Sequence, residues 1–137
     1  MRNMKFRAWD KTGNFMIYPE TDLLATHYND RGFEPDGMEV EMTLEGHAYI
    51  SAHFQYESPA FLDNELTLLQ FTGLTDKNGV EIYEGDIVQH GIFRRKIIFQ
   101  LCGFWLERSN GSKMPLWCEP KEVEVIGNIY ENPELLR

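Results

Sequence analysis

Residues 68–88, LLQFTGLTDKNGVEIYEGDIV, constrain the fold of this chain more than any other stretch. They indicate two strands joined by a tight turn, followed by a third strand that opens with Glu84-Gly85-Asp86-Ile87-Val88. The turn at Asp76-Lys77-Asn78-Gly79 is well marked, because Asn and Gly tolerate the positive φ angles that such turns require. This stretch therefore predicts short strands connected by glycine-containing turns.

Alternation with a period of two also dominates the rest of the first half. The clearest case is Met38–Leu44, where apolar residues alternate with Glu39, Glu41, Thr43 and Glu45 and predict a half-buried strand with a solvated acidic face. Residues 19–37 are rich in Pro, Gly, Asn and Asp and indicate mostly loop, although a short helix near residues 21–26 is an alternative. The strands expected here span residues 4–9 and 15–18 (a hairpin), 38–44, 48–54 and 66–71.

The second half has the rhythm of a small barrel. Its expected strands span residues 86–90, 93–100, 104–107, 116–118 and 123–130. Five short antiparallel strands that open with Glu84-Gly85-Asp86-Ile87-Val88 predict an SH3-like barrel, since closure of the sheet removes exposed strand edges. Asn132 and Pro133 predict a final helical turn, with Asn132 as the N-cap. We therefore expect a mainly β protein with an N-terminal antiparallel sheet region (residues 1–75) and an SH3-like region (residues 76–137); the boundary is soft, and a shared core stays open.

Three separated blocks carry a family resemblance. They are KFRAWD at residues 5–10, the 68–88 stretch, and VIGNIYENPEL at residues 125–135. In this order, and in a chain of this size, they closely resemble the YopX family. Its members are small proteins of phages and prophages in Gram-positive bacteria, and their biochemical role is largely undefined. The resemblance implies a phage or prophage setting, while residues 19–65 carry no block of the family.

Composition favours a soluble cytoplasmic protein with no membrane role, and the resemblance implies that the cytoplasm is that of a bacterial host. No apolar run approaches the roughly 20 residues that a membrane-spanning helix needs. The basic N-terminus is not followed by the apolar segment of a secretory signal. With no export signal, the two cysteines, Cys102 and Cys118, are expected to be reduced and buried.

The net charge of −9 belongs to one segment. Residues 19–65 contain eleven acidic residues and one basic residue, Arg31, so the remainder of the chain is close to neutral. An acidic surface repels nucleic-acid phosphates, because binding to nucleic acid depends on Lys and Arg. Two interpretations stay open: the acidic segment keeps the protein soluble, or it docks a basic protein surface or mimics nucleic acid.

The sequence contains no pattern typical of an enzyme or a cofactor site. His47 and His53 would lie roughly 20 Å apart along an extended strand, so they cannot chelate one ion without a bend. Glu84 and Asp86 could serve acid–base chemistry, but a carboxylate that accepts turn N–H groups is the simpler interpretation. No metal, cofactor or catalytic residue is predicted.

Basic and aromatic residues offer two further binding surfaces. Arg94 and Lys96 share one strand face, whereas Arg95 points the other way, so this face could contact nucleic acid or simply be solvated. Lys5 and Arg7 would strengthen the nucleic-acid interpretation if they lay beside it. Trp105 and Trp117, with Phe104, Phe71 and Tyr83, could line a peptide-binding groove, or could be core residues.

The leading functional hypothesis is a non-enzymatic phage or prophage accessory protein that binds a macromolecule, with a protein favoured as the partner, in the bacterial cytoplasm. The alternative is a small nucleic-acid-binding module that uses basic strand faces, and an enzyme of unknown class is a distant third. Homo-oligomerisation stays open. The candidate partner-binding residues are Glu39, Glu41, Glu45, Arg94, Lys96, Trp105 and Trp117.

Overall fold

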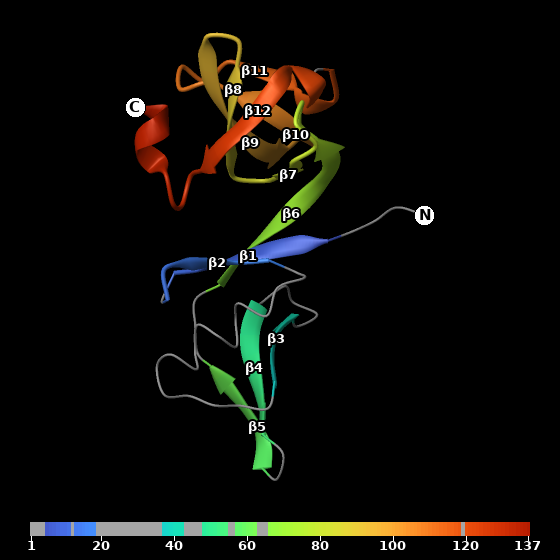
Figure 1. Cartoon of the computed structure of the whole chain (residues 1–137), viewed down its shortest axis with the longest axis vertical. Helices are drawn as coiled ribbons and strands as arrows, with labels where there is room; N and C mark the ends of the chain where they lie inside the picture. Colours follow the sequence, from blue (N-terminus) through green and yellow to red (C-terminus); the bar gives the residue numbers. More distant parts are fainter. Residues whose placement is uncertain are drawn as a thin grey trace. The chain divides into compact units, whose positions relative to one another are not determined.

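Antiparallel strands make up most of the described chain, which confirms the expected mainly β class. The computed structural model describes residues 5–11, 13–18, 37–42, 48–54, 57–62, 66–118 and 120–137, with backbone only between residues 37 and 62 and at Cys118. The elements (Figure 1) are β1 Phe6–Asp10, β2 Phe15–Ile17, β3 Gly37–Met42, β4 Ala48–Phe54, β5 Glu57–Leu62, β6 Leu66–Thr75, β7 Glu81–Tyr83, β8 Asp86–His90, β9 Phe93–Gln100, β10 Gly103–Glu107, β11 Lys113–Pro115, η1 Leu116–Cys118, η2 Pro120–Glu122, β12 Val123–Asn128 and η3 Pro133–Leu136.

The chain divides into two compact units. Unit 1 contains Met1–Phe6 and Leu69–Arg137, and unit 2 contains Arg7–Leu68. The division runs through β1 and β6, which belong to one sheet with the hydrogen-bonded order β2-β1-β6-β7. The two regions expected from the sequence, residues 1–75 and 76–137, keep all of β6 in the first region, whereas the two units divide it after Leu68. The expected boundary remains an expectation.

Unit 2 contains the predicted N-terminal hairpin and a separate small sheet. β1 and β2 are antiparallel, and the buried carboxylate of Asp10 closes their loop by accepting the Gly13 N–H at 2.9 Å. β3, β4 and β5 form an antiparallel three-stranded sheet in that order. β3 and β4 confirm the predicted strands 38–44 and 48–54, whereas β5 was not predicted, because Pro59 argues against a strand; β5 is an edge strand of this sheet, where proline is tolerated. The loop and short helix expected within residues 19–36 lie outside the described residues.

Unit 1 is built on a five-stranded antiparallel sheet with the order β11-β10-β9-β8-β12. The sheet curls into a half-barrel, as Figure 1 shows, and confirms the small barrel expected for the second half. Its inner face carries one apolar core of fully buried side chains, namely Ile82, Val88, Ile97, Leu106, Leu116 and Val123. Because the interior is filled by these residues, binding by this unit has to use its turns and its outer surface.

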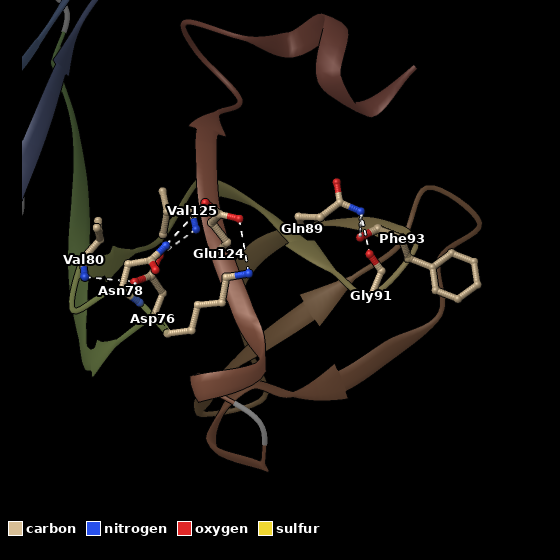
Figure 2. Close-up of polar contacts among 9 residues, drawn as sticks. Asp76, Asn78, Val80, Gln89, Gly91, Phe93, Glu124 and Val125 are labelled. Carbon is tan, nitrogen blue, oxygen red and sulfur yellow. Dashed lines mark hydrogen bonds and ion pairs between the residues drawn. The ribbon is translucent and has the colours of Figure 1, made fainter.

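The turn between β6 and β7 closes the outer edge of β12 (Figure 2). Asp76 is fully buried, and its carboxylate accepts the backbone N–H groups of Asn78, Val80 and Val125 at 2.8–2.9 Å. The Lys77 N–H donates to the Val123 carbonyl at 3.1 Å. Burial alone raises the pKa of the Asp76 carboxyl, but the three N–H donors and the charge of Lys121 outweigh burial and leave it below the ordinary value of 3.8. The Asp76 carboxylate and the Lys77 N–H thus bond backbone groups of β12 that a neighbouring strand would otherwise bond.

One local expectation for the second half was wrong, and another was confirmed in part. Residues 116–118 form the helical turn η1 rather than a strand, and the strand lies just before it at β11. Pro115 ends β11, and the Leu116 side chain turns into the core, so the pairing with β10 stops there. The final helical turn is confirmed as η3, with Asn132 at the N-cap position and Pro133 at the start of the turn, but the Asn132 side chain makes no capping bond; it accepts the Asn128 N–H at 3.3 Å.

Candidate protein-binding surface

The turn between β9 and β10 holds two apolar residues in an unfavourable backbone conformation. Gln100 pairs with Gly103, which leaves a two-residue loop of Leu101 and Cys102. Both loop residues have positive φ angles, 50° and 61°. Turns with two positive φ angles strongly prefer Asn-Gly, because Gly has no β-carbon and Asn tolerates the left-handed region, whereas most other side chains are strained there. Leu101 is also 80% exposed, so its side chain does not contribute to the core in return.

The turn at the opposite end of β9 shows the ordinary solution. Its two-residue loop is Gly91-Ile92, and the positive φ angle of 60° falls on the glycine. The Gln89 amide stabilises this turn by donating to the carbonyls of Gly91 and Phe93 at 2.9 and 3.2 Å (Figure 2). Ile92 is 87% exposed, but its backbone is not strained.

Neighbouring aromatic residues fix the β9–β10 turn in place. The Phe99 ring contacts the Phe104 ring edge to face, with centroids 5.1 Å apart, and Phe104 packs against the core. Phe99 nevertheless remains 52% exposed. The Trp105 indole N–H donates to the Gln100 carbonyl at 2.7 Å and so holds the turn from its other side. The ring contact and the indole hydrogen bond therefore hold in place a turn whose Leu101 side chain is exposed.

Trp117 adds a large apolar side chain at the same end of the sheet. β11 runs antiparallel to β10 and ends at Pro115 opposite Trp105, so η1 continues toward the start of β10 at Gly103. Leu116 fixes η1 in the core, while the Trp117 side chain is 73% exposed. We call Phe99, Leu101 and Trp117 the turn patch.

The basic side chains of β9 are mostly engaged within unit 1. Arg94 donates to the Leu135 carbonyl at 3.1 Å. Lys96 and Lys113 both pair with Glu107, at 3.3 and 3.5 Å. The Arg108 guanidinium stacks on Phe93 at 3.7 Å from the ring centroid, and Arg95 lies 5.8 Å from the same ring. The predicted separation of Arg95 from Arg94 and Lys96 fits the pairing of Arg95 with the core strand position Val88.

The other predicted binding residues lie in several places. Trp105 is partly buried and supports the turn, whereas Trp117 is the most exposed of the five aromatic residues proposed for a groove. The ring centroids of Phe71 and Tyr83 lie 5.4 Å apart, and Tyr83 is buried. Lys5 pairs with Glu81 and lies over Phe71, within the same cluster.

The acidic residues can be placed only along the backbone. Glu39 and Glu41 lie in β3 opposite Ser51 and Tyr49. Glu45 lies outside the described residues. The role of these residues in binding a partner stays a prediction.

Sequence reasoning missed Phe99, Leu101 and Cys102. Cys102 was expected to be buried, but it is exposed in the turn, because its position is a loop residue rather than a strand residue. A signal was available in Ile97–Leu106, ten consecutive residues without a charge. Such a run suggests core, although the expected strands 93–100 and 104–107 leave residues 101–103 as their connection; the register Gln100↔Gly103 shows that the loop is Leu101 and Cys102.

The described residues contain no group of three His, Cys, Asp or Glu side chains that could hold a metal ion. Asp86, one of the two carboxylates considered for acid–base chemistry, accepts the Tyr83 N–H at 2.8 Å, as the simpler interpretation predicted. In the part of the chain that is described, the helices are too short and too polar to cross a membrane.

Comparison with known proteins gives one consistent result. No curated protein matches the chain. Protein EF1440 from Enterococcus faecalis is similar in structure, with a TM-score of 0.59, 27% sequence identity and full coverage of both chains. Protein yopX from Bacillus subtilis is similar with a TM-score of 0.62 and 20% identity, covering 96% of this chain and 97% of that one. A family model described as YopX protein matches residues 5–137, and the chain therefore belongs to the YopX family.

Proposed function

We propose that this chain is a phage or prophage accessory protein that acts in the bacterial cytoplasm by binding another protein, without catalysing a reaction. The observation that carries this proposal is the exposure of large apolar side chains at one end of unit 1, with Leu101 at 80%, Trp117 at 73% and Phe99 at 52%. Exposed apolar residues that cluster on a supported element are typical of protein-binding surfaces. The family relationship supports the phage setting.

The charge distribution favours a protein over nucleic acid. Unit 1 contains ten basic and ten acidic residues, and unit 2 contains three basic and twelve acidic residues. On unit 1, Lys96 and Lys113 share one carboxylate, and Arg94 is bound to a backbone carbonyl. Phosphate binding needs several cations free to replace counterions, and these contacts compete with it.

A nucleic-acid-binding module remains the second candidate, and one observation favours it. Arg108 and Arg95 lie against the Phe93 ring at 3.7 and 5.8 Å, and an aromatic ring with arginines is a common platform for single-stranded nucleic acid. This group is small, and the acidic unit 2 opposes the approach of a phosphate backbone.

Two measurements on the intact protein distinguish these candidates. The first is affinity capture from an infected or lysogenic host lysate with identification by mass spectrometry, for which we expect a specific protein. The second is a titration with duplex and single-stranded DNA at near-physiological salt, for which we expect weak and salt-sensitive binding. Sub-micromolar DNA affinity that falls on Arg108→Gln or Arg94→Gln, with unchanged thermal stability, would establish the second candidate instead.

A further inference from the structure

The strained turn between β9 and β10 requires an explanation beyond folding. Both Leu101 and Cys102 occupy the left-handed region, at φ 50° and 61°, where Asn and Gly are the favoured residues. The turn at the other end of β9, by contrast, has a glycine at its one positive-φ position, which is the favoured residue type. Backbone strain that persists at an exposed position points to a role for the side chains held there.

The side chains held by this strain lie at an end of the sheet that exposes further apolar side chains. Leu101 is at the tip, Phe99 is anchored through Phe104, and Trp117 emerges from η1 at the same end of the sheet. Leu116 and Phe104 pack in or against the core and so fix η1 and the start of β10, and the Trp105 indole N–H holds the end of β9 at Gln100. The patch is therefore pre-organised, which lowers the entropic cost of binding.

We propose that the turn patch of Phe99, Leu101 and Trp117 inserts into an apolar pocket of a partner protein, with Leu101 as the leading side chain. This inference rests on the proposed function and identifies the surface that performs it. A convex tip with one aliphatic and two aromatic residues fits a concave apolar site, where a few buried anchors supply most of the binding energy.

Charge argues against the other surfaces that an apolar tip could enter. Residues 97–106 carry no charge, and the whole chain has a net charge of −9. Anionic lipid headgroups and nucleic acids both recruit proteins through Lys and Arg, which this tip lacks. Crosslinking distinguishes a second copy of the chain, which could also receive an uncharged tip, from the proposed partner.

The central variant replaces Leu101-Cys102 by Asn-Gly, the pair that this turn geometry prefers. We expect Leu101→Asn/Cys102→Gly to raise the Tm by about 3 °C or more, because it removes strain. The same variant should reduce capture of the partner at least about tenfold, because it removes the leading side chain. Ile92→Asn is the matched control, since Ile92 is equally exposed in an unstrained turn at the opposite end of β9, and it should leave capture unchanged.

The partner is identified with the photo-crosslinking residue p-benzoylphenylalanine, placed separately at positions 92, 101 and 117 in a soluble extract of the source bacterium. One protein crosslinked from positions 101 and 117, absent from position 92 and lost in the Asn-Gly variant, is the expected result. A crosslink to a second copy of the chain, or binding to phosphatidylglycerol vesicles that the variant abolishes, overturns the proposal. So does a Tm that falls, or capture that stays within twofold of wild type.

These outcomes separate the inference from the proposed function. If a specific protein is still captured by the Asn-Gly variant, the chain binds a protein through another surface, and only the turn patch is excluded. If neither the wild-type chain nor any crosslinking position captures a protein, the proposed function itself fails, and the turn patch fails with it.

Discussion

Buried oxygen atoms of Asp and Asn side chains close the turns of this protein. Asp10 accepts the Gly13 N–H, Asp86 accepts the Tyr83 N–H, and the Asn128 side chain accepts the N–H groups of Tyr130 and Glu131. All three side chains are buried. Each satisfies N–H groups that a strand would otherwise bond, so the turns tolerate burial without an unpaired polar group.

Asp76 is the strongest case and makes stability depend on pH. Its pKa is lowered in the folded protein, so the unfolded chain binds more protons in this range and stability rises with pH. The contribution is complete above the ordinary pKa of 3.8 and is lost as the pH falls below it through the folded pKa. We expect Asp76→Asn to lower the free energy of unfolding by about 1.5–3 kcal/mol at neutral pH.

Chemical denaturation across a pH series tests this expectation. The difference between wild type and Asp76→Asn should be constant at neutral pH and should shrink below pH 3.8, because the variant has no proton to gain at this site. A difference that stays the same in acid would show that the ionised carboxylate contributes nothing beyond its shape.

Gly79 and Gly85 give a second prediction at the residue scale. Their φ angles are +80° and +86°, as expected from the sequence, so Gly79→Val should destabilise by about 1–3 kcal/mol. Gly85→Val should cost more, because a β-carbon there meets Tyr130 at 3.3 Å, whereas the space at Gly79 is open. Thermal unfolding compares the two variants, with Gly103→Ala as the control, since a β-carbon at that position would make only ordinary contacts. Equal shifts for all three would refute the turn argument.

At the scale of elements, the sequence predicted strands well and the ends of strands poorly. β1, β2, β3, β4, β8, β9, β10 and β12 lie where the sequence predicted strands, from alternation in the first half and from the spacing of short strands and turns in the second. Alternation reports which face of a strand is buried, but it cannot distinguish Leu116 in a helical turn from Leu116 in a strand, since both bury the side chain. β5 was missed because Pro59 is a weak sign of an edge strand and a strong sign against a central one.

The candidate surface was predictable only in part, for a related reason. Trp117 was named from its residue type alone, which does not tell an exposed indole from a buried one. Leu101 was missed, because an apolar residue between two apolar strands is ordinarily core. Its exposure follows from the register Gln100↔Gly103, which makes the loop two residues long. Register depends on pairing between strands, and local sequence does not specify it.

The ion pairs between β9, β10 and β11 provide a prediction at this scale. Glu107 joins Lys96 and Lys113 across three strands, and its side chain is 19% exposed. We expect Glu107→Gln to lower the free energy of unfolding by less than about 1 kcal/mol, since partly exposed pairs are weak, and the effect should fade at high salt. Glu124→Gln, which removes the more exposed pair with Lys77, is the control and should have a smaller effect. A large loss that persists in high salt would show that Glu107 acts by packing rather than by charge.

At the scale of the whole molecule, the net charge is divided unevenly between the two units. Unit 2 carries a net charge of −9, whereas unit 1 is neutral and presents the turn patch. In a protein that binds through apolar contacts, charge outside the contact acts on solubility and on the rate of encounter rather than on the bound state. The two units can then contribute to different steps of one binding reaction.

The acidic strand β3 gives the last prediction, because the two interpretations of its charge differ in kinetics. If Glu39 and Glu41 only keep the protein soluble, Glu39→Gln/Glu41→Gln should leave partner capture intact and stability equal or slightly higher, since self-repulsion falls. If they steer a basic partner, association should slow most at low salt, because rim charges act mainly on the on-rate. We expect the first outcome, measured as association rates across a salt series with the captured partner. A low-salt slowing of about threefold or more, absent at high salt, would show instead that the acidic strand guides the partner toward unit 1.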